Sequence, residues 1–533
     1  MRRVAFIVAT IAVAGALAWM FAQAVSTTRP LAALFPSGPL LYLEAKDFQS
    51  LLKDWNSSQE KKLWLAGDNY QVFSRSNLFL KLQNAQNEFA AAAGLPPNMA
   101  LLDGAAGTES ALAMYDIGEL QFLYITRMPQ AKFAESALWK VRGSYQPRKS
   151  AGLDYYVRVD RASKRVAAFA SARDYLLLAT REDALAGALS LLSGQTTPNV
   201  TQEPWFSKSV QAAKQPGELR LVMNMERLLQ SPYMRSYWIQ RNASELKQYT
   251  AAISDARRNS SELDESRILF RTNEEPVAWN EAAVAQLVRL APANAGLFRA
   301  WASPTSAQAF DLLRRKILEP QTETATNDKH APEAGSIDAT VGSESDLEIR
   351  INEPPLESSA EESLDGLRRL LDAAKLEAAM QIESSRVLPD GSFVGIDSAI
   401  VLLAASDWNS AAVKTATASV TGGLAAIDIA VSGRTLVAAT RPELAQSILR
   451  GAANQQASQG ARYVARFRHS AELPNFIRMT RLIDNPLKTD APSFFSGNIA
   501  SLGRALGRLD SASITVHDTG AIVSQDLVYR WKQ

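Results

Sequence analysis

Apolar and polar residues alternate in several short segments of the chain. Residues 110–115 and 122–126 form two such segments in the first half, and the apolar strand 398–405 in the second half is expected to be the counterpart of one of them. Alternation with a period of two places apolar side chains on one face of a sheet and polar side chains on the other. The β-rich segments 513–517 and 521–529 flank a short loop with a glycine, which predicts a hairpin.

Other segments have the spacing of amphipathic helices. Apolar residues recur at helical intervals over Phe48–Trp55, and they do so approximately over Phe310–Ile317. In both places a turn and a short apolar strand come just before the helix. Strands and helices mixed in this way predict an α+β fold with a mostly antiparallel sheet and packed helices.

The two halves of the chain share these patterns in the same order. Residues 176–185 and 436–445 both run from an apolar strand through Ala-Thr-Arg into an acidic first helical turn, where the Thr can cap the helix. Three further pairs keep the order: 36–44 with 292–300, one of the strands 110–115 and 122–126 with 398–405, and 217–224 with 460–467. We predict two related α+β modules, 30–275 and 276–533. The alternative is two domains that share only generic strand and helix patterns.

Composition marks the boundary between the modules and an insertion in the second one. A polar turn at 274–276 precedes the helical stretch 279–290, and a strand at 266–271 is expected to close the first module. Residues 320–344 are rich in Glu, Thr, Ser and Asp and poor in large apolar side chains. Such a segment cannot bury enough surface to offset its ordering entropy, so it predicts a disordered insertion.

The N-terminal segment is expected to enter a membrane. A basic start, Met1–Arg3, precedes eighteen uncharged residues, Val4–Phe21. At a helical rise of about 1.5 Å per residue they span roughly 27 Å, close to the hydrocarbon thickness of a bilayer. The Ala-x-Ala tripeptide at 22–24 favours a cleaved signal peptide, whereas the aromatic residues Trp19 and Phe21 favour a retained helix.

Both interpretations of residues 1–25, signal peptide or membrane anchor, have the same consequence for the rest of the chain. The basic start stays in the cytoplasm, so the modules are exported to the outer side of the cytoplasmic membrane or the periplasm. If residues 4–21 are not cleaved, they bind the cytoplasmic membrane. No other apolar run of this length occurs in the sequence.

Composition limits the kinds of binding, catalytic and metal site that the chain can form. The 57 basic and 55 acidic residues nearly balance, which gives no electrostatic footprint for nucleic acid. The chain has no cysteine, so it cannot form disulfides, thiolate metal sites or a lipoprotein anchor. Its three histidines, His330, His469 and His517, are far apart in sequence. We therefore predict no catalytic residues, no cofactor-binding residues and no metal site.

Two weak patterns bear on catalysis. Residues 50–53 and 58–61 match the Ser-x-x-Lys spacing of penicillin-interacting enzymes, but the Lys-Thr-Gly strand of that class is replaced by Lys488-Thr489-Asp490. Carboxylates that converge only in space leave no local pattern. An alternative function is an envelope hydrolase that acts on glycan or peptide. Its candidate acids in the strand-rich region are Asp116, Glu119, Asp154 and Asp160.

An aromatic segment is the candidate recognition surface. Residues 70–79 combine aromatic anchors with an arginine that can donate hydrogen bonds, through Tyr70, Phe73, Arg75 and Phe79. The alternative is a helical hairpin that packs these rings into the core of a module.

The opening segment Phe35–Glu44, the helix Phe48–Trp55 and the repeated Ala-Thr-Arg segments resemble a bacterial family of exported proteins whose function is unknown. The resemblance covers both modules and implies export and repetition, without an activity. We therefore expect a non-catalytic exported protein of the cell envelope that binds an envelope component, such as a glycan, or a protein partner.

Overall fold

The computed structural model describes residues 29–95, 104–213, 215–231, 246–274, 278–318, 358–388, 394–421, 427–451, 459–483, 497 and 500–532. The contacts divide the chain into two compact units, which are described separately. Unit 1 comprises residues 1–56 and 77–255, and unit 2 comprises residues 57–76 and 256–533. The hydrophobic segment 4–21 and the insertion 320–344 lie outside the described residues. Within the described part, no helix is both long and apolar enough to span a bilayer.

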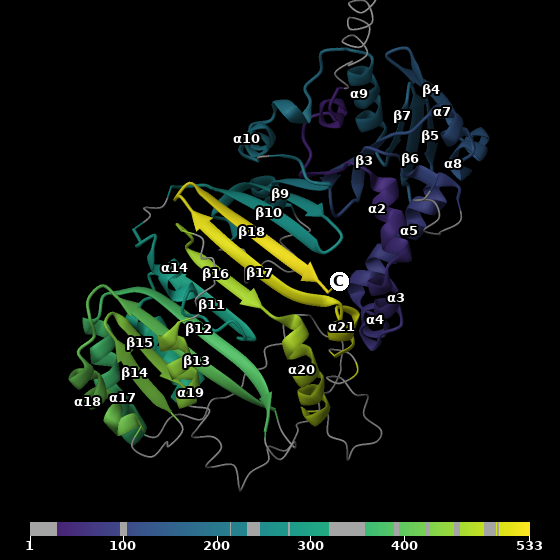
Figure 1. Ribbon diagram of the computed structural model, residues 1–533. Helices are drawn as coiled ribbons and strands as arrows, with labels where there is room; N and C mark the ends of the chain where they lie inside the picture. Colours follow the sequence, from purple (N-terminus) through teal and green to yellow (C-terminus); the bar gives the residue numbers. More distant parts are fainter. Residues whose placement is uncertain are drawn as a thin grey trace, which may run out of the picture. The chain divides into compact units, whose positions relative to one another are not determined.

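Unit 1 is built on an antiparallel sheet with the strand order β4–β5–β6–β7–β3–β2–β1–β8. Strands β3 to β7 of this sheet are labelled in Figure 1. Its strands are β1 (Leu41–Ala45), β2 (Ser110–Asp116), β3 (Gln121–Arg127), β4 (Gln146–Ser150), β5 (Leu153–Val159), β6 (Val166–Ala172), β7 (Tyr175–Ala179) and β8 (Leu219–Asn224). Strand β9 (Tyr249–Arg258) carries the chain from unit 1 into unit 2.

The strands of unit 2 pair antiparallel in the order β14–β15–β13–β12–β11–β16–β17–β18–β10. Its strands are β10 (Glu262–Arg271), β11 (Leu297–Ala302), β12 (Leu376–Val387), β13 (Val394–Ala404), β14 (Asp428–Ser432), β15 (Thr435–Ala439), β16 (Tyr463–Phe467), β17 (Leu509–Asp518) and β18 (Ile522–Trp531). The predicted C-terminal hairpin is confirmed as β17 and β18.

The strand orders confirm two related α+β modules. Six strands of unit 1, β6–β7–β3–β2–β1–β8, follow the same order as β14–β15–β13–β12–β11–β16 of unit 2. Leu41 and Leu297, paired by the sequence, are the first residues of the equivalent strands β1 and β11. Equal strand order in both halves favours related modules over a generic similarity of patterns.

The repeated Ala-Thr-Arg segment has the same structural role in both units. Helices α9 (Glu182–Leu192) and α19 (Pro442–Arg450) each follow it directly. The expectation that the Thr caps the helix is wrong, because neither helix has a side-chain cap. Instead, the hydroxyl oxygens of Thr180 and Thr440 each accept a hydrogen bond of 2.9 Å from the neighbouring strand, from the N–H of Phe122 and of Ser398. The threonine therefore fixes the strand end, not the helix start.

Helices cover the sheet of unit 1. They are α2 (Phe48–Ser57), α5 (Asn77–Ala93), α7 (Gln130–Ala134), α8 (Ala137–Lys140), α9, α10 (Pro204–Ala212) and α11 (Met225–Gln230), with the short 3₁₀ turns η1 (Leu31–Leu34), η2 (Arg142–Ser144) and η3 (Val200–Gln202). A buried cluster around Phe133, Tyr145 and Phe169 packs between α5, α7, α8 and the sheet. Aromatic rings in edge contact thus supply much of this core.

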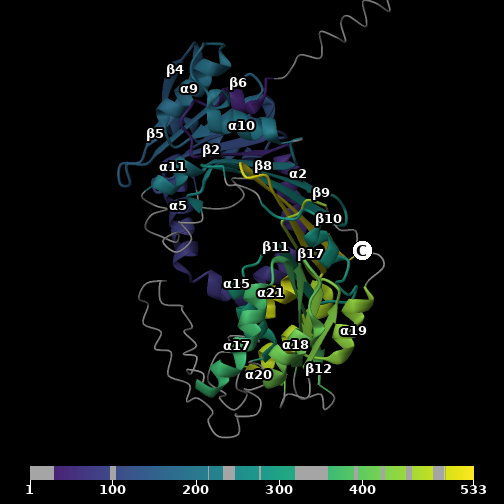
Figure 2. The ribbon, with the colours of Figure 1, turned by 90° about the vertical axis from the view of Figure 1, so that its left-hand side faces the viewer.

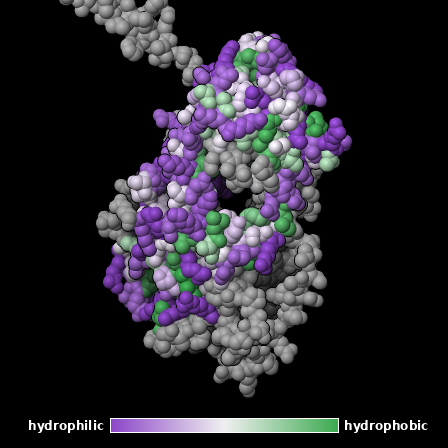
Figure 3. Space-filling model, turned by 90° about the vertical axis from the view of Figure 1, so that its right-hand side faces the viewer, coloured by the Kyte–Doolittle hydropathy of each residue, from purple (hydrophilic) through white to green (hydrophobic). Residues whose placement is uncertain are grey.

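In unit 2, helices cover both faces of the sheet around β11, β12, β13 and β15 (Figure 2). Its helices are α3 (Gln59–Leu65), α4 (Asp68–Phe73), α14 (Ala283–Val288), α15 (Ser306–Leu313), the π-helical turn η4 (Arg314–Leu318), α17 (Ser358–Ala373), α18 (Ser410–Thr421), α19, α20 (His469–Ile483) and α21 (Ala500–Ala505). Alternate residues of β11 divide the two cores: Phe298 and Ala300 pack under α14 and α19, whereas Trp301 packs against the cluster of α15 and α17. In Figure 3, hydrophobic residues form small groups among hydrophilic ones on the coloured surface.

The junction between the units differs from two expectations. The strand expected at 266–271 to close the first module belongs to β10, which pairs along its length with β18 in unit 2. An alternating pattern specifies a strand but not its partner, which is why this prediction is wrong. The contacts divide the chain inside β9, whereas composition placed the boundary at 274–276, of which Glu275 and Pro276 lie outside the described residues.

Candidate functional site

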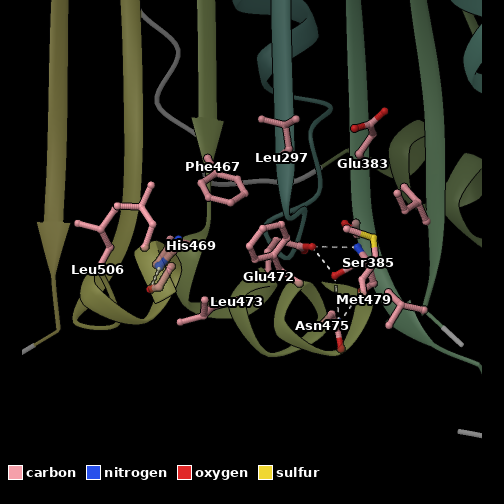
Figure 4. Close-up of a pocket in the computed structure, with 16 residues that line it drawn as sticks. Leu297, Glu383, Ser385, Phe467, His469, Glu472, Leu473, Asn475, Met479 and Leu506 are labelled. Carbon is pink, nitrogen blue, oxygen red and sulfur yellow. Dashed lines mark hydrogen bonds between the residues drawn. The ribbon is translucent and has the colours of Figure 1, made fainter. Parts of the chain in front are cut away.

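An apolar cavity of about 400 Å³ lies in unit 2, where β11, β12, β13 and β16 reach the same edge of the sheet. Helices α20 and α21 wall it on the side away from the strands (Figure 4). Its lining comprises Leu297, Glu383, Ser384, Ser385, Val394, Ile396, Phe467, His469, Glu472, Leu473, Asn475, Phe476, Met479, Leu502, Gly503 and Leu506. This cavity, called the unit 2 pocket below, is the candidate site.

Strand alternation and helix periodicity place its apolar walls. Leu297 and Phe467 are cross-strand partners in β11 and β16, so both side chains project from the same face. On α20, Leu473, Phe476 and Met479 recur at intervals of three residues, which brings them to one side of the helix. The pocket therefore forms because an apolar helix face approaches the sheet without filling the space beneath it.

The rim of the pocket exposes apolar side chains to solvent. Ile396 is 55% exposed, Leu502 45%, Leu506 39% and Phe467 37%. Large apolar residues on a shared rim are unusual for a surface that meets only water, and they mark ligand or partner sites.

A polar cluster fastens α20 to the end of β12. The Glu472 carboxylate accepts a hydrogen bond of 3.1 Å from the Ser385 N–H and a second one from the Ser385 hydroxyl. Asn475 Nδ2 donates to the Ser385 hydroxyl at 3.0 Å and to its carbonyl at 3.2 Å, as the dashed lines of Figure 4 show. Gly296 lies against this cluster, and a Cβ there would lie 1.8 Å from Glu472 Oε1, so a larger residue would displace the Glu472 carboxylate.

His469 and Glu383 are likewise engaged by neighbouring groups. His469 Nε2 lies 3.3 Å from the Gly503 carbonyl, and burial lowers the pKa of the imidazole, which favours its neutral form. The Glu383 carboxylate accepts a hydrogen bond of 2.6 Å from Gln381 Nε2 and forms a 2.9 Å ion pair with Lys316. These groups therefore hold elements of unit 2 together.

The remaining histidines lie apart from the unit 2 pocket or outside the described residues. His517 belongs to β17 and is not part of the pocket lining. Its Nδ1 lies 3.1 Å from the Gly460 carbonyl. His330 lies outside the described residues. Within the described ranges, no group of three or more His, Asp or Glu side chains is arranged to hold a metal ion. The absence of metal and cofactor residues stays a prediction for the whole chain.

A second, polar cavity of about 850 Å³ lies in unit 1 at the start of α9. Its acids are engaged by arginines: Glu88 pairs with Arg165 at 3.0 Å, and Glu182 with Arg148 at 2.5 Å. Glu119 also lines it and lies 3.4 Å from Arg165. Each of these three carboxylates therefore has an arginine partner within unit 1.

The other acids considered for hydrolysis lie elsewhere. Asp116 accepts from the Glu119 N–H at 2.8 Å within a turn, and exposed Asp154 lies 3.4 Å from Lys149. Hydrogen bonds from Ser163 lower the pKa of Asp160, which is also a turn residue. Of these four acids, Glu119 lines the polar cavity of unit 1, whereas the other three line neither that cavity nor the unit 2 pocket. The structure therefore does not bring the set together.

The serines of the Ser-x-x-Lys matches occupy helix starts. The Ser50 N–H and hydroxyl each donate a hydrogen bond of 2.9 Å to the Asp47 carboxylate. The Ser58 hydroxyl caps α3 by accepting a hydrogen bond of 3.1 Å from the Lys61 N–H. Their local hydrogen bonds explain both residues without catalysis.

The candidate recognition residues fall in both units. Tyr70 and Phe73 belong to α4 in unit 2, are half-buried, and pack against Trp64 with ring centroids 4.9 and 5.7 Å away. Arg75 is exposed just after α4, and half-buried Phe79 belongs to α5 in unit 1. The ring contacts agree with the packing interpretation, and recognition through these residues stays a prediction.

Comparison with protein-family models finds no match, and comparison with curated proteins finds none. Among solved structures, crystal form III of TP0453 is similar over 46% of this chain and 81% of that chain, with 12% identity and a TM-score of 0.25. Crystal form I of TP0453 is similar over 46% and 80%, with 13% identity and a TM-score of 0.25. A likeness at this TM-score carries no inference about function.

Proposed function

We propose that this chain is a non-catalytic, exported binding protein of the cell envelope, and that the unit 2 pocket holds the apolar part of an envelope component. The observation that carries the proposal is an apolar cavity whose polar groups already satisfy one another. Pockets that bind small molecules fall at about 300–1,000 Å³ and are mostly apolar.

The state of the pocket's polar groups favours binding over catalysis. A general acid or base needs a free hydrogen-bond position toward its substrate. Glu472 is engaged with Ser385, and the His469 ring nitrogen lies against the Gly503 carbonyl. Their partners belong to the protein itself, so these groups serve to hold the walls.

Export is the second part of the proposal. It rests on the basic start and the uncharged segment 4–21, which are features of the sequence. On this proposal the two units work at the outer side of the cytoplasmic membrane or in the periplasm, where lipids, glycans and other envelope proteins are available. If the segment is not cleaved, the membrane itself is a partner.

Photolabelling tests binding in the pocket. The full-length chain, held in nanodiscs of zwitterionic lipid, is irradiated with a neutral diazirine-bearing alkyl alcohol, and labelled peptides are identified by mass spectrometry. We expect the labels to concentrate on α20 and α21, whose residues line the pocket. Met479→Trp fills the pocket and reduces this labelling about tenfold, since a larger side chain occupies the ligand's space.

The matched control is Val159→Trp, which adds the same side chain at a 52%-exposed position of unit 1. It leaves the labelling unchanged. Labels spread evenly over the chain, or equal labelling of a folded Met479→Trp variant, would overturn the proposed pocket.

A further inference from the structure

One carboxylate interrupts the apolar face of α20. Leu473, Phe476 and Met479 line the unit 2 pocket from this helix. Glu472 also lines it, and it lies four residues before Phe476 and seven before Met479. Residues at these intervals share one face of a helix, so the Glu472 side chain belongs to the pocket wall.

The solvent-facing side of α20 carries its arginines. Arg478 and Arg481 are exposed, as are Ala471 and Pro474, and these four positions recur at intervals of three and four residues. None of the four lines the pocket. Helix periodicity thus turns both arginines away from the pocket and from the face that carries Glu472.

Cationic side chains are missing from the pocket wall as well. None of the described residues that line the cavity is a lysine or an arginine. Arg468, the arginine nearest to Glu472 in sequence, donates to a backbone carbonyl at 3.4 Å. The other carboxylate of the lining, Glu383, is paired with Lys316 at 2.9 Å. Within the described part of unit 2, Glu472 is therefore held by hydrogen bonds and has no ion-pair partner.

The oxygens of the Glu472 carboxylate both face protein atoms. Oε2 accepts hydrogen bonds from the Ser385 N–H and hydroxyl (Figure 4). Oε1 lies against Gly296, where a Cβ would be 1.8 Å away. A ligand is thus not offered an open carboxylate to contact. The negative charge still acts on a ligand in the pocket, because electrostatic interactions are screened less in apolar surroundings than in water.

The size and the rim of the pocket suit the chain of an amphiphile. A dry apolar cavity of roughly 150 Å³ accommodates benzene, and the unit 2 pocket, at about 400 Å³, has room for a considerably longer apolar group. Ile396 and Leu502, at 55% and 45% exposed, stand where the cavity meets solvent. A ligand that reaches this boundary has its chain against an apolar wall and its head group in water, close to the Glu472 charge.

We infer that Glu472 determines the specificity of the unit 2 pocket: its charge excludes anionic amphiphiles, so that the occupant is the chain of an uncharged amphiphile. The inference rests on the proposed function, since it names the chemical class of ligand for the same pocket. An amide at position 472 would accept the same hydrogen bonds from Ser385. Fastening α20 to β12 therefore does not by itself require a carboxylate, whereas exclusion of anions does.

Photoreactive amphiphiles with equal chains and different head groups test the inference. The full-length chain in zwitterionic nanodiscs is labelled with diazirine alkyl probes that end in a hydroxyl, a sulfonate or a trimethylammonium group. Labelling of the nanodisc scaffold protein corrects for partitioning into the bilayer. We expect the alcohol to label α20 and α21 most strongly, since a charged head group loses hydration near an apolar wall. The like charge of Glu472 adds to this cost for the sulfonate, which labels about tenfold less than the trimethylammonium probe.

Glu472→Gln isolates the effect of the charge. The amide oxygen still accepts from Ser385, so we expect hydrogen exchange in α20 to stay as in the wild type. The sulfonate and trimethylammonium probes then label α20 and α21 equally, and labelling by the alcohol is unchanged. The matched control is Glu443→Gln, which removes the same charge at an exposed position of unit 2 outside the pocket lining and keeps the preference for the cationic over the anionic probe.

The outcomes separate the inference from the proposed function. If the sulfonate and trimethylammonium probes label the wild type equally, or Glu472→Gln keeps their difference, Glu472 does not select the ligand and the pocket stands. Stronger labelling by either charged probe than by the alcohol also contradicts the inference. Should the Gln variant loosen α20, the comparison of probes on the wild type decides. If no probe labels α20 or α21 above other peptides, the proposed function itself fails.

Discussion

Asp518 joins three parts of unit 2 through a single carboxylate. It accepts a hydrogen bond of 2.8 Å from the Arg271 guanidinium of β10 and one of 2.9 Å from the Gly520 N–H. It also forms an ion pair with Arg462. Burial raises the pKa of this carboxyl, but the hydrogen bonds and ion pairs outweigh burial and lower the pKa from 3.8 to about 2. The hairpin of β17 and β18 is thereby tied to the neighbouring strands.

The depressed pKa predicts a specific acid sensitivity. Because the pKa of folded Asp518 lies below the unfolded value, its contribution to stability is present above the unfolded pKa and is lost as the pH falls toward about 2. We expect Asp518→Asn to lower the free energy of unfolding of unit 2 at neutral pH by about 2 kcal/mol. It also flattens the acid limb of the stability profile, measured by urea unfolding at several pH values.

The matched control is Asp526→Asn in β18, where the carboxylate is exposed. Its stability profile stays parallel to that of the wild type. An acid limb as steep in Asp518→Asn as in the wild type would show that other carboxylates control acid unfolding.

At the scale of single elements, local patterns predict the repeat well and the pocket poorly. Residues 176–185 and 436–445 are contiguous, so their strand-to-helix pattern is visible in the sequence and reappears as β7–α9 and β15–α19. The pocket draws residues from Leu297 to Leu506, and no short segment contains its shape. The row of apolar residues on α20 is the available signal, but it does not show that the face stays unfilled.

The attachment of α20 to β12 is the element on which the pocket depends. Ser385→Ala removes the hydroxyl that donates to Glu472 and accepts from Asn475. We expect amide hydrogen exchange in α20 to accelerate about tenfold, because loss of one such partner leaves a carboxylate and an amide less satisfied. Exchange followed by mass spectrometry measures the change for each peptide.

Ser144→Ala provides the comparison for that variant. Its hydroxyl donates 2.8 Å to the Val141 carbonyl on the surface of unit 1, so its removal leaves exchange in α20 unchanged. Unchanged exchange in Ser385→Ala as well would mean that apolar packing alone holds α20.

At the scale of the whole molecule, duplication explains the fold and divergence explains the site. Both units keep the same order of six strands, whereas the strand pair β4–β5 extends the sheet of unit 1 beyond β6. The polar cavity of unit 1 and the apolar pocket of unit 2 both include residues at the start of the equivalent strands β3 and β13, but the first cavity is bounded by α9 and the second by α20. Both units share a hydrophobic pattern and a strand order. Their cavities differ because different helices flank the strands in each unit.

The insertion 320–344 is expected to contribute little to folding. Its composition offers few core-forming side chains, and the cost of closing a loop varies only slowly with loop length. A chain that lacks residues 320–344 is therefore expected to unfold within a few degrees of the wild type, as measured by calorimetry. A loss of melting temperature well beyond that range would show that the segment packs against unit 2.

Export makes the broadest prediction, because it concerns where both units operate. Alkaline phosphatase, which acts only outside the cytoplasm, is expected to be active when fused after Trp531. A reporter that requires the cytoplasm is expected to be inactive at the same position. Replacing Arg2 and Arg3 by Glu weakens the charge asymmetry that orients segment 4–21 and reduces the exported fraction. Mass spectrometry of the N-terminus then decides between the two interpretations: a mature chain that begins at Val25 identifies a signal peptide, and an intact Met1 identifies an anchor. Full reporter activity in the cytoplasm would contradict export, and with it the proposed location of the binding function in the cell envelope.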